Sequence, residues 1–139
     1  MTPKTPVKSD RSYTVEDYYK TPEGVHMELI NGVFYDMAPP NRAHQKISGE
    51  LFGTIRDHIR SKGGSCEVYA APFGVQLFPD DDTTVVEPDI NVICDKNKLT
   101  DRGCTGAPDW IIEIISPSTT SRDYIKKREL YKKAGVRYY

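Results

Sequence analysis

The sequence feature that most constrains the fold is the run Trp-Ile-Ile-Glu-Ile-Ile at residues 110–115. In an extended segment, successive side chains point to opposite faces, so both faces of this run would be apolar. A strand of this kind is normally buried on both faces of a mixed or parallel sheet, with helices covering each side. The run therefore predicts an interior β-strand with one charged residue, Glu113, in its middle.

The segments before this run predict a helix, a hairpin and a longer helix. An acidic first turn and Pro and Gly breakers favour a short helix within residues 12–24. The pair Asn31-Gly32 between two apolar runs predicts a β-hairpin with strands near 25–30 and 33–38. Apolar residues at every fourth position predict an amphipathic helix over residues 43–62.

Two further strands are expected on either side of an acidic turn, Pro-Asp-Asp-Asp-Thr-Thr, which is a solvated hairpin turn without the spaced ligands of a calcium loop. Their sequences are CEVYAAPFGVQLF and VVEPDINVIC. After the 110–115 strand, a helix from about Ser121 to Gly135 leads into the start of an extended segment. This order predicts an α/β or α+β fold, with a single domain over residues 12–139 and a flexible tail at residues 1–11.

Composition limits the classes of function. A net charge of -1 gives no global attraction to nucleic acid, so a polyanionic partner would need a local patch. The three cysteines, Cys66, Cys94 and Cys104, are odd in number and lack Cys-x-x-Cys spacing, which predicts reduced thiols. No apolar run approaches the roughly 20 residues that span a bilayer. These observations together predict a cytoplasmic protein without a membrane segment.

Glu113 needs compensation, because an ionised carboxylate in a dry strand must find a cation, a hydrogen-bond network or a raised pKa. On the final helix, Lys127 falls on the same face as Leu130 and Tyr131, which is the packing side. A helix that follows a strand through a short loop commonly packs back on the sheet. Lys127 is therefore expected to reach Glu113, and a purely structural ion pair between the two is the alternative to a functional site.

Two more carboxylates occur in apolar surroundings. Asp89 heads the apolar run Ile-Asn-Val-Ile, and Glu28 lies between Met27 and Leu29. Alone, Asp89 would be interpreted as a turn residue at the start of a strand, and Glu28 as a solvent-facing position in the hairpin. Convergent carboxylates with one lysine suit Mg²⁺ or Mn²⁺ rather than zinc, and such sites hydrolyse phosphodiester bonds.

Three segments carry a resemblance to a known family: MELINGVFYDMAPPNRAH, VEPDINVICD and DWIIEIISPSTTSRDYIKKRELYKKAGVRYY. With them the chain resembles, over nearly all of residues 13–139, the Uma-two family of restriction endonucleases in the PD-(D/E)XK nuclease superfamily. The resemblance implies a restriction-endonuclease-like mixed sheet flanked by helices, and a bacterial homodimer. It also implies a metal site of Glu28, Asp89 and Glu113, with Lys127 as the basic member and His44 at the rim.

Two departures from the pattern matter. Ile115 stands where the superfamily usually has its lysine, so that role is expected to have moved to Lys127. The family continues with further strands beyond the position of Tyr139, so the sheet is expected to be truncated at its C-terminal end. The sequence thus predicts a Mg²⁺- or Mn²⁺-dependent endonuclease acting on DNA. The alternative is a catalytically silent DNA-binding or homodimeric assembly module on the same scaffold.

Overall fold

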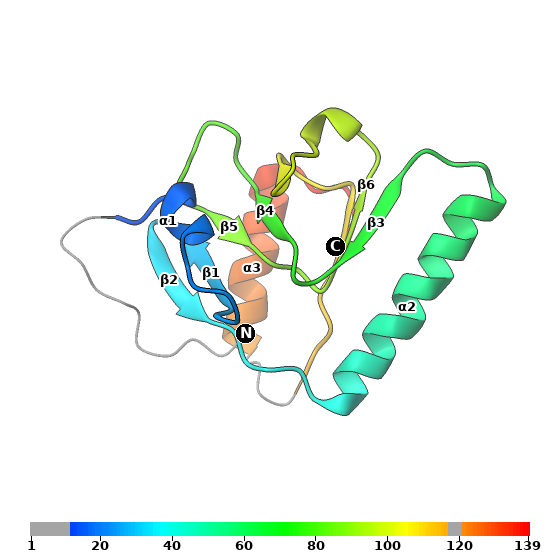
Figure 1. Ribbon diagram of the computed structural model, residues 1–139, viewed down its shortest axis with the longest axis horizontal. Helices are drawn as coiled ribbons and strands as arrows, with labels where there is room; N and C mark the ends of the chain where they lie inside the picture. Colours follow the sequence, from blue (N-terminus) through cyan, green and yellow to red (C-terminus); the bar gives the residue numbers. More distant parts are fainter. Residues whose placement is uncertain (1–11, 117–120) are drawn as a thin grey trace.

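The computed structural model of the chain describes residues 12–116 and 121–139, with side chains from residue 124 onward in the second segment. The expected flexible tail at residues 1–11 lies outside the described residues. Figure 1 shows the elements in space. In chain order they are α1 (Val15–Tyr19), β1 (Met27–Ile30), β2 (Val33–Asp36), α2 (Arg42–Ser61), β3 (Glu67–Ala70), β4 (Gly74–Gln76), β5 (Val85–Val86), β6 (Ile90–Ile93), the 3-10 turn η1 (Lys96–Lys98), β7 (Gly103–Thr105), β8 (Trp110–Ile112) and α3 (Ser121–Ala134).

The strands form two sheets. One has five strands in the order β2-β1-β5-β4-β7, and the other has three in the order β3-β6-β8. Neighbouring strands run antiparallel, except for β4 and β7, which run parallel. The mixed α+β class predicted from the sequence is confirmed, although η1 and β7 were not expected.

The hairpin prediction is confirmed with shorter strands. β1 pairs with β2 through Asn31 and Gly32, which both have positive φ angles, of 50° and 79°. Only residues that tolerate the left-handed region suit such a turn. The short first helix also forms, after Thr14, whose backbone N–H bonds the Asp17 carboxylate three residues on. The hairpin places Glu28 on β1, an interior strand of the five-stranded sheet, between β2 and β5.

The two long strands expected between residues 66 and 94 were wrong in extent, because each is broken at a proline. CEVYAAPFGVQLF becomes β3 and β4 on either side of Pro72, and VVEPDINVIC becomes β5 and β6 on either side of Pro88. Proline has no N–H to donate to a ladder. The halves enter different sheets, so the chain crosses from one sheet to the other at each break. The second break places Asp89 at the junction of the two sheets.

The strand predicted at residues 110–115 was also too long and less buried than expected. β8 ends at Ile112, Trp110 is 39% exposed and Ile115 is 74% exposed. One side of β8 pairs with β6, and the other meets the chain end, where Ile111 N donates to Tyr138 O at 2.9 Å. Glu113 therefore follows the end of a strand rather than lying in the middle of one.

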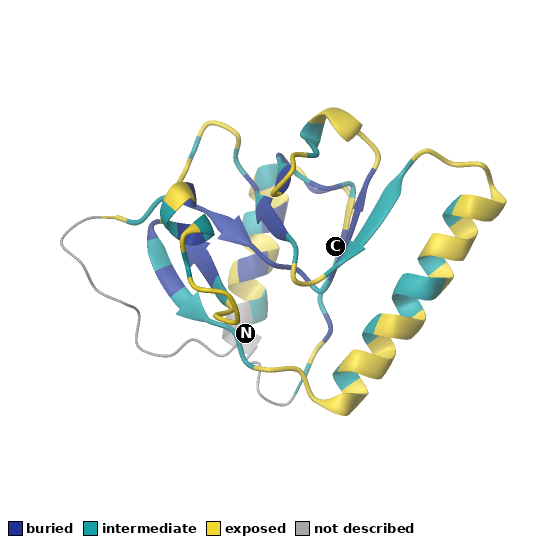
Figure 2. Ribbon diagram, viewed as in Figure 1, coloured by how far each residue is buried: buried dark blue, intermediate teal, exposed yellow. Residues whose placement is uncertain are grey.

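The long helix α2 forms as predicted, but it buries none of its residues. It packs partly on β3 and stands to one side of the molecule, where most of its surface is exposed (Figures 1 and 2). Its apolar residue Ile47 is 47% exposed. The first turns of α2 contribute His44 and Ser48 to the lining of a cavity.

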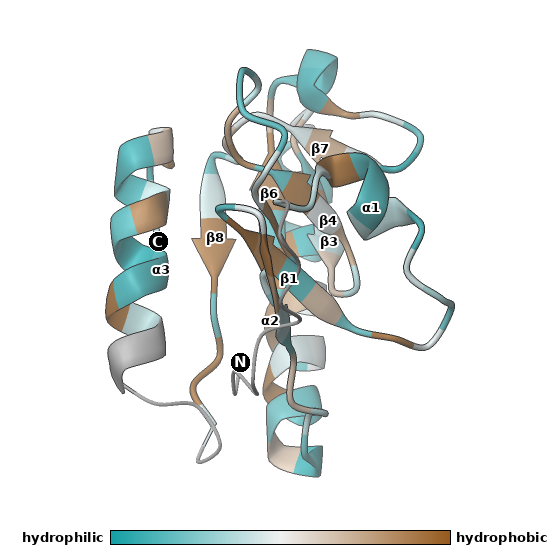
Figure 3. Cartoon of the chain, turned by 90° about the vertical axis from the view of Figure 1, so that its left-hand side faces the viewer, coloured by the Kyte–Doolittle hydropathy of each residue, from teal (hydrophilic) through white to brown (hydrophobic). Residues whose placement is uncertain are grey.

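The apolar core lies between the sheets and α3. Figure 3 shows the apolar residues gathered on the strands, with a mostly hydrophilic α3 beside them. Tyr131 is the largest fully buried side chain, and it anchors α3 in this cluster. The main buried cluster is Ile30, Val75, Leu77, Val86, Ile93, Cys104, Ile111, Tyr131 and Val136.

The prediction that the three cysteines are reduced was wrong for two of them. Cys66 and Cys94 form a disulfide, with Cα atoms 4.0 Å apart, and Cys104 is a free, buried thiol. The register of β3 and β6 pairs Glu67 with Ile93, which places Cys66 and Cys94 opposite each other. Spacing in the sequence does not reveal a cross-strand pair of this kind.

The prediction of a cytoplasmic location rested partly on reduced thiols, so it loses that support and stays a prediction. Within the described residues, no helix has the length and apolar character needed to cross a membrane.

Candidate active site

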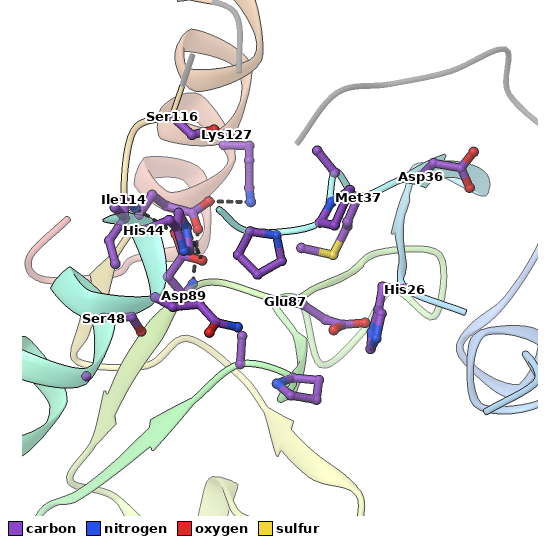
Figure 4. A pocket seen from close by; sticks show the side chains of 18 of the residues that line it. His26, Asp36, Met37, His44, Ser48, Glu87, Asp89, Ile114, Ser116 and Lys127 are labelled. Atoms are coloured by element: carbon purple, nitrogen blue, oxygen red, sulfur yellow. Dashed lines mark hydrogen bonds and ion pairs between the residues drawn. The ribbon is translucent and has the colours of Figure 1, made fainter. Parts of the chain in front are cut away.

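Four predicted site residues converge from four different parts of the fold. Glu28 lies on β1, Asp89 precedes β6, Glu113 follows β8 and Lys127 lies on α3. Asp89, Glu113 and Lys127 line a cavity of about 940 Å³, while Glu28 is fully buried beneath it. The cavity is bounded by the segment after β2 and by the first turns of α2 (Figure 4).

Lys127 links two of the carboxylates. It is 4% exposed, its Nζ donates to Glu28 Oε2 at 3.0 Å, and it forms an ion pair with Glu113 Oε2. Burial lowers the pKa of Lys127, but the negative charges of Glu113 and Glu28 outweigh burial and hold it well above its usual value. The prediction that Lys127 faces inward is confirmed, and the Glu113–Lys127 ion pair considered as the structural alternative is present as well.

Glu113 and Asp89 are fixed against each other by backbone N–H groups. Asp89 N donates to Glu113 Oε1 at 3.3 Å, and Ile114 N donates to Asp89 Oδ2 at 2.6 Å. A third donor, Tyr131 Oη, reaches Glu113 Oε2 at 2.9 Å. The two carboxylates therefore lie on the same side of the junction, where they can act on one ligand.

His44 belongs to this group, as the resemblance implied. Its backbone N–H is capped by Asn41 Oδ1 at 2.8 Å, which fixes the start of α2. Its Nε2 lies 3.1 Å from Asp89 Oδ1, and its Nδ1 is buried without a partner among the described residues. His44 thus forms a wall of the cavity and holds Asp89 from the side opposite Ile114.

A fourth carboxylate, Glu87, was missed. It is buried, its backbone N–H donates to Glu28 Oε2 at 2.8 Å, and its Oε2 accepts from Tyr18 Oη at 2.6 Å. Burial raises the pKa of Glu87 and nearby Glu28 adds to the rise, while the bond from Tyr18 opposes it. The signal was available, because Glu87 interrupts an apolar run in the same way as Glu113.

The donor set fits a hard divalent cation by chemical type, since all the candidate ligands are carboxylate oxygens. Glu28 Oε1 is buried and has no hydrogen-bond partner among the described residues, so an acceptor is left over. The remaining oxygens are engaged by Lys127, His44 and backbone N–H groups. Among the side chains that the structure describes, at residues 12–116 and 124–139, no three of His, Cys, Asp or Glu form a metal cluster by themselves.

Comparison with known proteins identifies the family of the chain. The model of one protein family, described as "Uma2: Putative restriction endonuclease", matches residues 15–139. The chain belongs to the Uma2 family. This confirms the resemblance inferred from the three sequence segments.

Two relatives place this Uma2 chain among known sequences and folds. An uncharacterized protein of Synechocystis sp. (strain ATCC 27184 / PCC 6803 / Kazusa) is 29% identical over 104 residues, which cover 75% of this chain and 53% of the relative. The chain thus spans about half the length of this curated relative. A crystal structure from Anabaena variabilis, titled as a putative nuclease belonging to DUF820, superposes with a TM-score of 0.67 at 23% identity, covering 86% of this chain and 68% of that one. This second likeness shows a shared fold.

The departure at Ile115 has a structural explanation in this Uma2 chain. Ile115 is 74% exposed and is absent from the cavity lining, although its neighbours Ile114 and Ser116 are part of it. Lys127 reaches the same carboxylates from α3 instead. A cationic side chain is thus present at the site from a different element.

Proposed function

We propose that this Uma2 chain carries the site of a divalent-metal-dependent endonuclease that hydrolyses phosphodiester bonds in DNA. One observation supports the proposal most: three carboxylates and one buried lysine from four separate segments meet at an open cavity. A structural ion pair needs one carboxylate and one lysine, and the additional convergence of Asp89 and Glu28 has no such explanation. The family description supplies the class of reaction.

In this proposal Glu28, Asp89 and Glu113 hold Mg²⁺ or Mn²⁺. Their three negative charges face the single ammonium of Lys127, and a divalent cation is the simplest compensation for the excess. The bound ion would neutralise charge on the scissile phosphate and activate the attacking water.

The chain's own residues would position the reacting groups. Lys127, held by Glu28 and Glu113, presents an ammonium that can donate to a non-bridging phosphate oxygen as charge develops there. His44 orients Asp89, and Tyr131 orients Glu113. Because α2 contributes His44, the approach of α2 to the sheet junction determines the geometry of the site.

A catalytically silent DNA-binding or homodimeric assembly module is the second candidate. It is favoured by the fact that both oxygens of Asp89 and both of Glu113 already have partners among the described residues. A metal would have to share these oxygens with Lys127 and His44. In this candidate the cluster stabilises the junction of the sheets, and the cavity binds without hydrolysing.

Cleavage of supercoiled plasmid DNA in Mg²⁺ or Mn²⁺ distinguishes the two candidates. The wild-type protein is expected to nick or linearise the plasmid, and Glu113→Ala and Lys127→Ala are each expected to lower the rate about 100-fold or more, as removal of a transition-state charge contact does. Lys132→Ala is the matched control, because Lys132 is exposed on the same helix. It should retain the wild-type rate.

Two outcomes would contradict the nuclease proposal. One is activity that survives both Glu113→Ala and Lys127→Ala. The other is an inactive wild-type protein that is folded and metal-loaded, which would support the silent module. Sedimentation equilibrium on the same samples tests for the homodimer that the family resemblance implies, so that inactivity of a monomer is not mistaken for inactivity of the assembly.

A further inference from the structure

A second, smaller cavity opens beside the first. Its volume is about 280 Å³, at the lower end of the range for small-molecule pockets. The two cavities share a wall, which consists of Gly24, Val25, His26, Pro72 and Glu87. The two cavities are therefore neighbours, separated by these residues.

Glu87 connects the second cavity to the candidate active site. Glu28 Oε2 accepts a hydrogen bond from Lys127 Nζ and another from the backbone N–H of Glu87. The carboxylate of Glu28 therefore bridges Lys127 and Glu87. In the view of Figure 4, Glu87 and His26 lie next to each other, apart from the pair formed by His44 and Asp89. The first cavity thus has a cation, Lys127, that suits a phosphate group, and Glu87 lies at a separate place where the two cavities adjoin.

The second cavity is lined by aromatic rings and by a guanidinium group. Tyr18, Tyr19 and Phe73 line it, and the guanidinium of Arg102 lies over the Tyr19 ring at 4.2 Å from its centroid. The Arg102 side chain is 50% exposed, so part of its surface remains accessible. Nucleobases stack on tyrosine rings and on arginine guanidinium planes in proteins that bind single strands.

The charges of the second cavity disfavour a phosphate as its occupant. Its buried charged group is the Glu87 carboxylate, which accepts hydrogen bonds and repels anions. Arg102, the cation in the lining, already forms two hydrogen bonds to the Glu16 carboxylate, at 3.0 and 3.2 Å. Glu87 Oε2 is engaged by Tyr18, while Oε1 receives no donor from the described part of the chain. The cavity therefore suits a flat group that carries an N–H donor.

We propose that the second cavity binds a nucleobase of the DNA substrate and that Glu87 accepts a hydrogen bond from its exocyclic amino group. Carboxylates accept from the amino group of cytosine in known protein–DNA contacts, whereas thymine offers a carbonyl oxygen at the same position. The site thus favours cytosine over thymine. A base that stacks on these side chains has left the base stack of its own strand, which makes single-stranded DNA the preferred ligand. The inference rests on the proposed function, since it assumes a nucleotide at the adjoining cavity.

Binding of two labelled single strands tests this inference without a cleavage readout. The probes are oligo(dC) and oligo(dT) of about 12 nucleotides, measured in Ca²⁺ buffer and checked afterwards to be intact. The wild-type protein is expected to bind oligo(dC) roughly fivefold more tightly or better, the discrimination of one good base contact. In Glu87→Gln, the amide oxygen can accept from Tyr18 and the amide N–H₂ can donate to thymine. The ratio of the affinity for oligo(dC) to the affinity for oligo(dT) should therefore fall to about one, or the preference should reverse.

Two arginine variants control for folding and for charge. Arg102→Ala should weaken both probes by the same factor, roughly fivefold, and leave their ratio unchanged, because stacking tolerates any base. Arg60→Ala removes the same charge from the exposed end of α2, away from both cavities, and should change neither affinity.

Equal binding of both probes by the wild-type protein would overturn the inference, as would absence of binding to either probe. A ratio that survives Glu87→Gln would also overturn it. Each of these results leaves the plasmid cleavage assay to decide the nuclease proposal separately. Conversely, a Glu87-dependent preference for oligo(dC) in a protein that does not cleave plasmid DNA would support the proposed base-binding cavity and contradict the nuclease proposal.

Discussion

Lys127 and Tyr131 are the two side chains of α3 on which the electrostatics of the candidate site depend. Both are buried and both contact Glu113 Oε2. Removal of Lys127 would leave two carboxylates, Glu28 and Glu113, without their cation, and an unpaired buried charge typically costs about 3–5 kcal/mol. Both contacts need the proton, because the ammonium of Lys127 and the hydroxyl of Tyr131 bind the Glu113 carboxylate only in their protonated forms.

Alkaline pH should destabilise the protein through these protons. Burial, followed by the charge of Glu113, raises the pKa of Tyr131 in the folded state, whereas an unfolded tyrosine ionises near pH 10. The native protein thus binds more protons than the unfolded chain above about pH 10. The contribution of Tyr131 to stability is complete below that pH and is lost as the pH rises toward its folded pKa. Lys127 shifts in the same direction.

Guanidinium unfolding at pH 8, 9, 10 and 11 measures this effect. The free energy of unfolding of the wild type should fall more steeply above about pH 10 than that of Tyr131→Phe, by up to about 1.4 kcal/mol per pH unit for one proton. Burial also raises the pKa of Cys104, to about 11, but Cys104 is common to both proteins. Tyr138→Phe, at an exposed tyrosine, should behave as the wild type. Equal slopes in the wild type and Tyr131→Phe would contradict this account.

At the level of elements, the sequence predicts local structure well and the partners of strands poorly. Helical spacing in α2, and the Asn31-Gly32 turn, are local signals, and both predictions were correct. The apolar runs around Pro72 and Pro88 gave no indication that their halves join different sheets, because an apolar pattern does not specify which strand a segment pairs with. The spacing of α2 likewise did not show that its apolar face is only partly covered. These features depend on tertiary contacts, which a local pattern does not contain.

The disulfide between Cys66 and Cys94 is the element-scale feature that differs most from expectation, and it can be tested directly. It joins the ends of β3 and β6 and closes a loop with a sequence separation of 28. Alkylation of the unfolded, non-reduced protein followed by mass spectrometry should find one modified cysteine, Cys104. Removal of the disulfide by Cys66→Ser should lower the free energy of unfolding by about 3 kcal/mol, from loop entropy in the unfolded chain. Cys104→Ser gives a comparison variant without loss of the cross-link.

Three alkylated cysteines would show that the disulfide is absent. In that case, Cys66→Ser should cost no more than an ordinary substitution at a partly exposed position, within about 0.5 kcal/mol.

At the scale of the whole molecule, the site lies where the two sheets meet and where the start of α2 approaches them. Glu113 and Lys127 could be connected from the sequence, because burial of one charge demands another nearby. Glu87 was not predicted, because it precedes Pro88 in a segment expected to form a strand, and only the fold shows that its side chain is buried. The second cavity could not be predicted, because it is formed by residues from α1 and from the segments before β1, β4, β6 and β7. Its place beside the first cavity exists only in the folded chain.

The central claim is that the carboxylates at the sheet junction hold a divalent cation, and isothermal titration calorimetry with Mn²⁺ tests it most directly. The account predicts saturable binding of one Mn²⁺ per chain in the wild type, loss of that binding in Asp89→Asn, and wild-type binding in Asp80→Asn, which changes an exposed carboxylate outside the cavities. Absence of binding to the folded wild type, or binding that Asp89→Asn leaves unchanged, would contradict it.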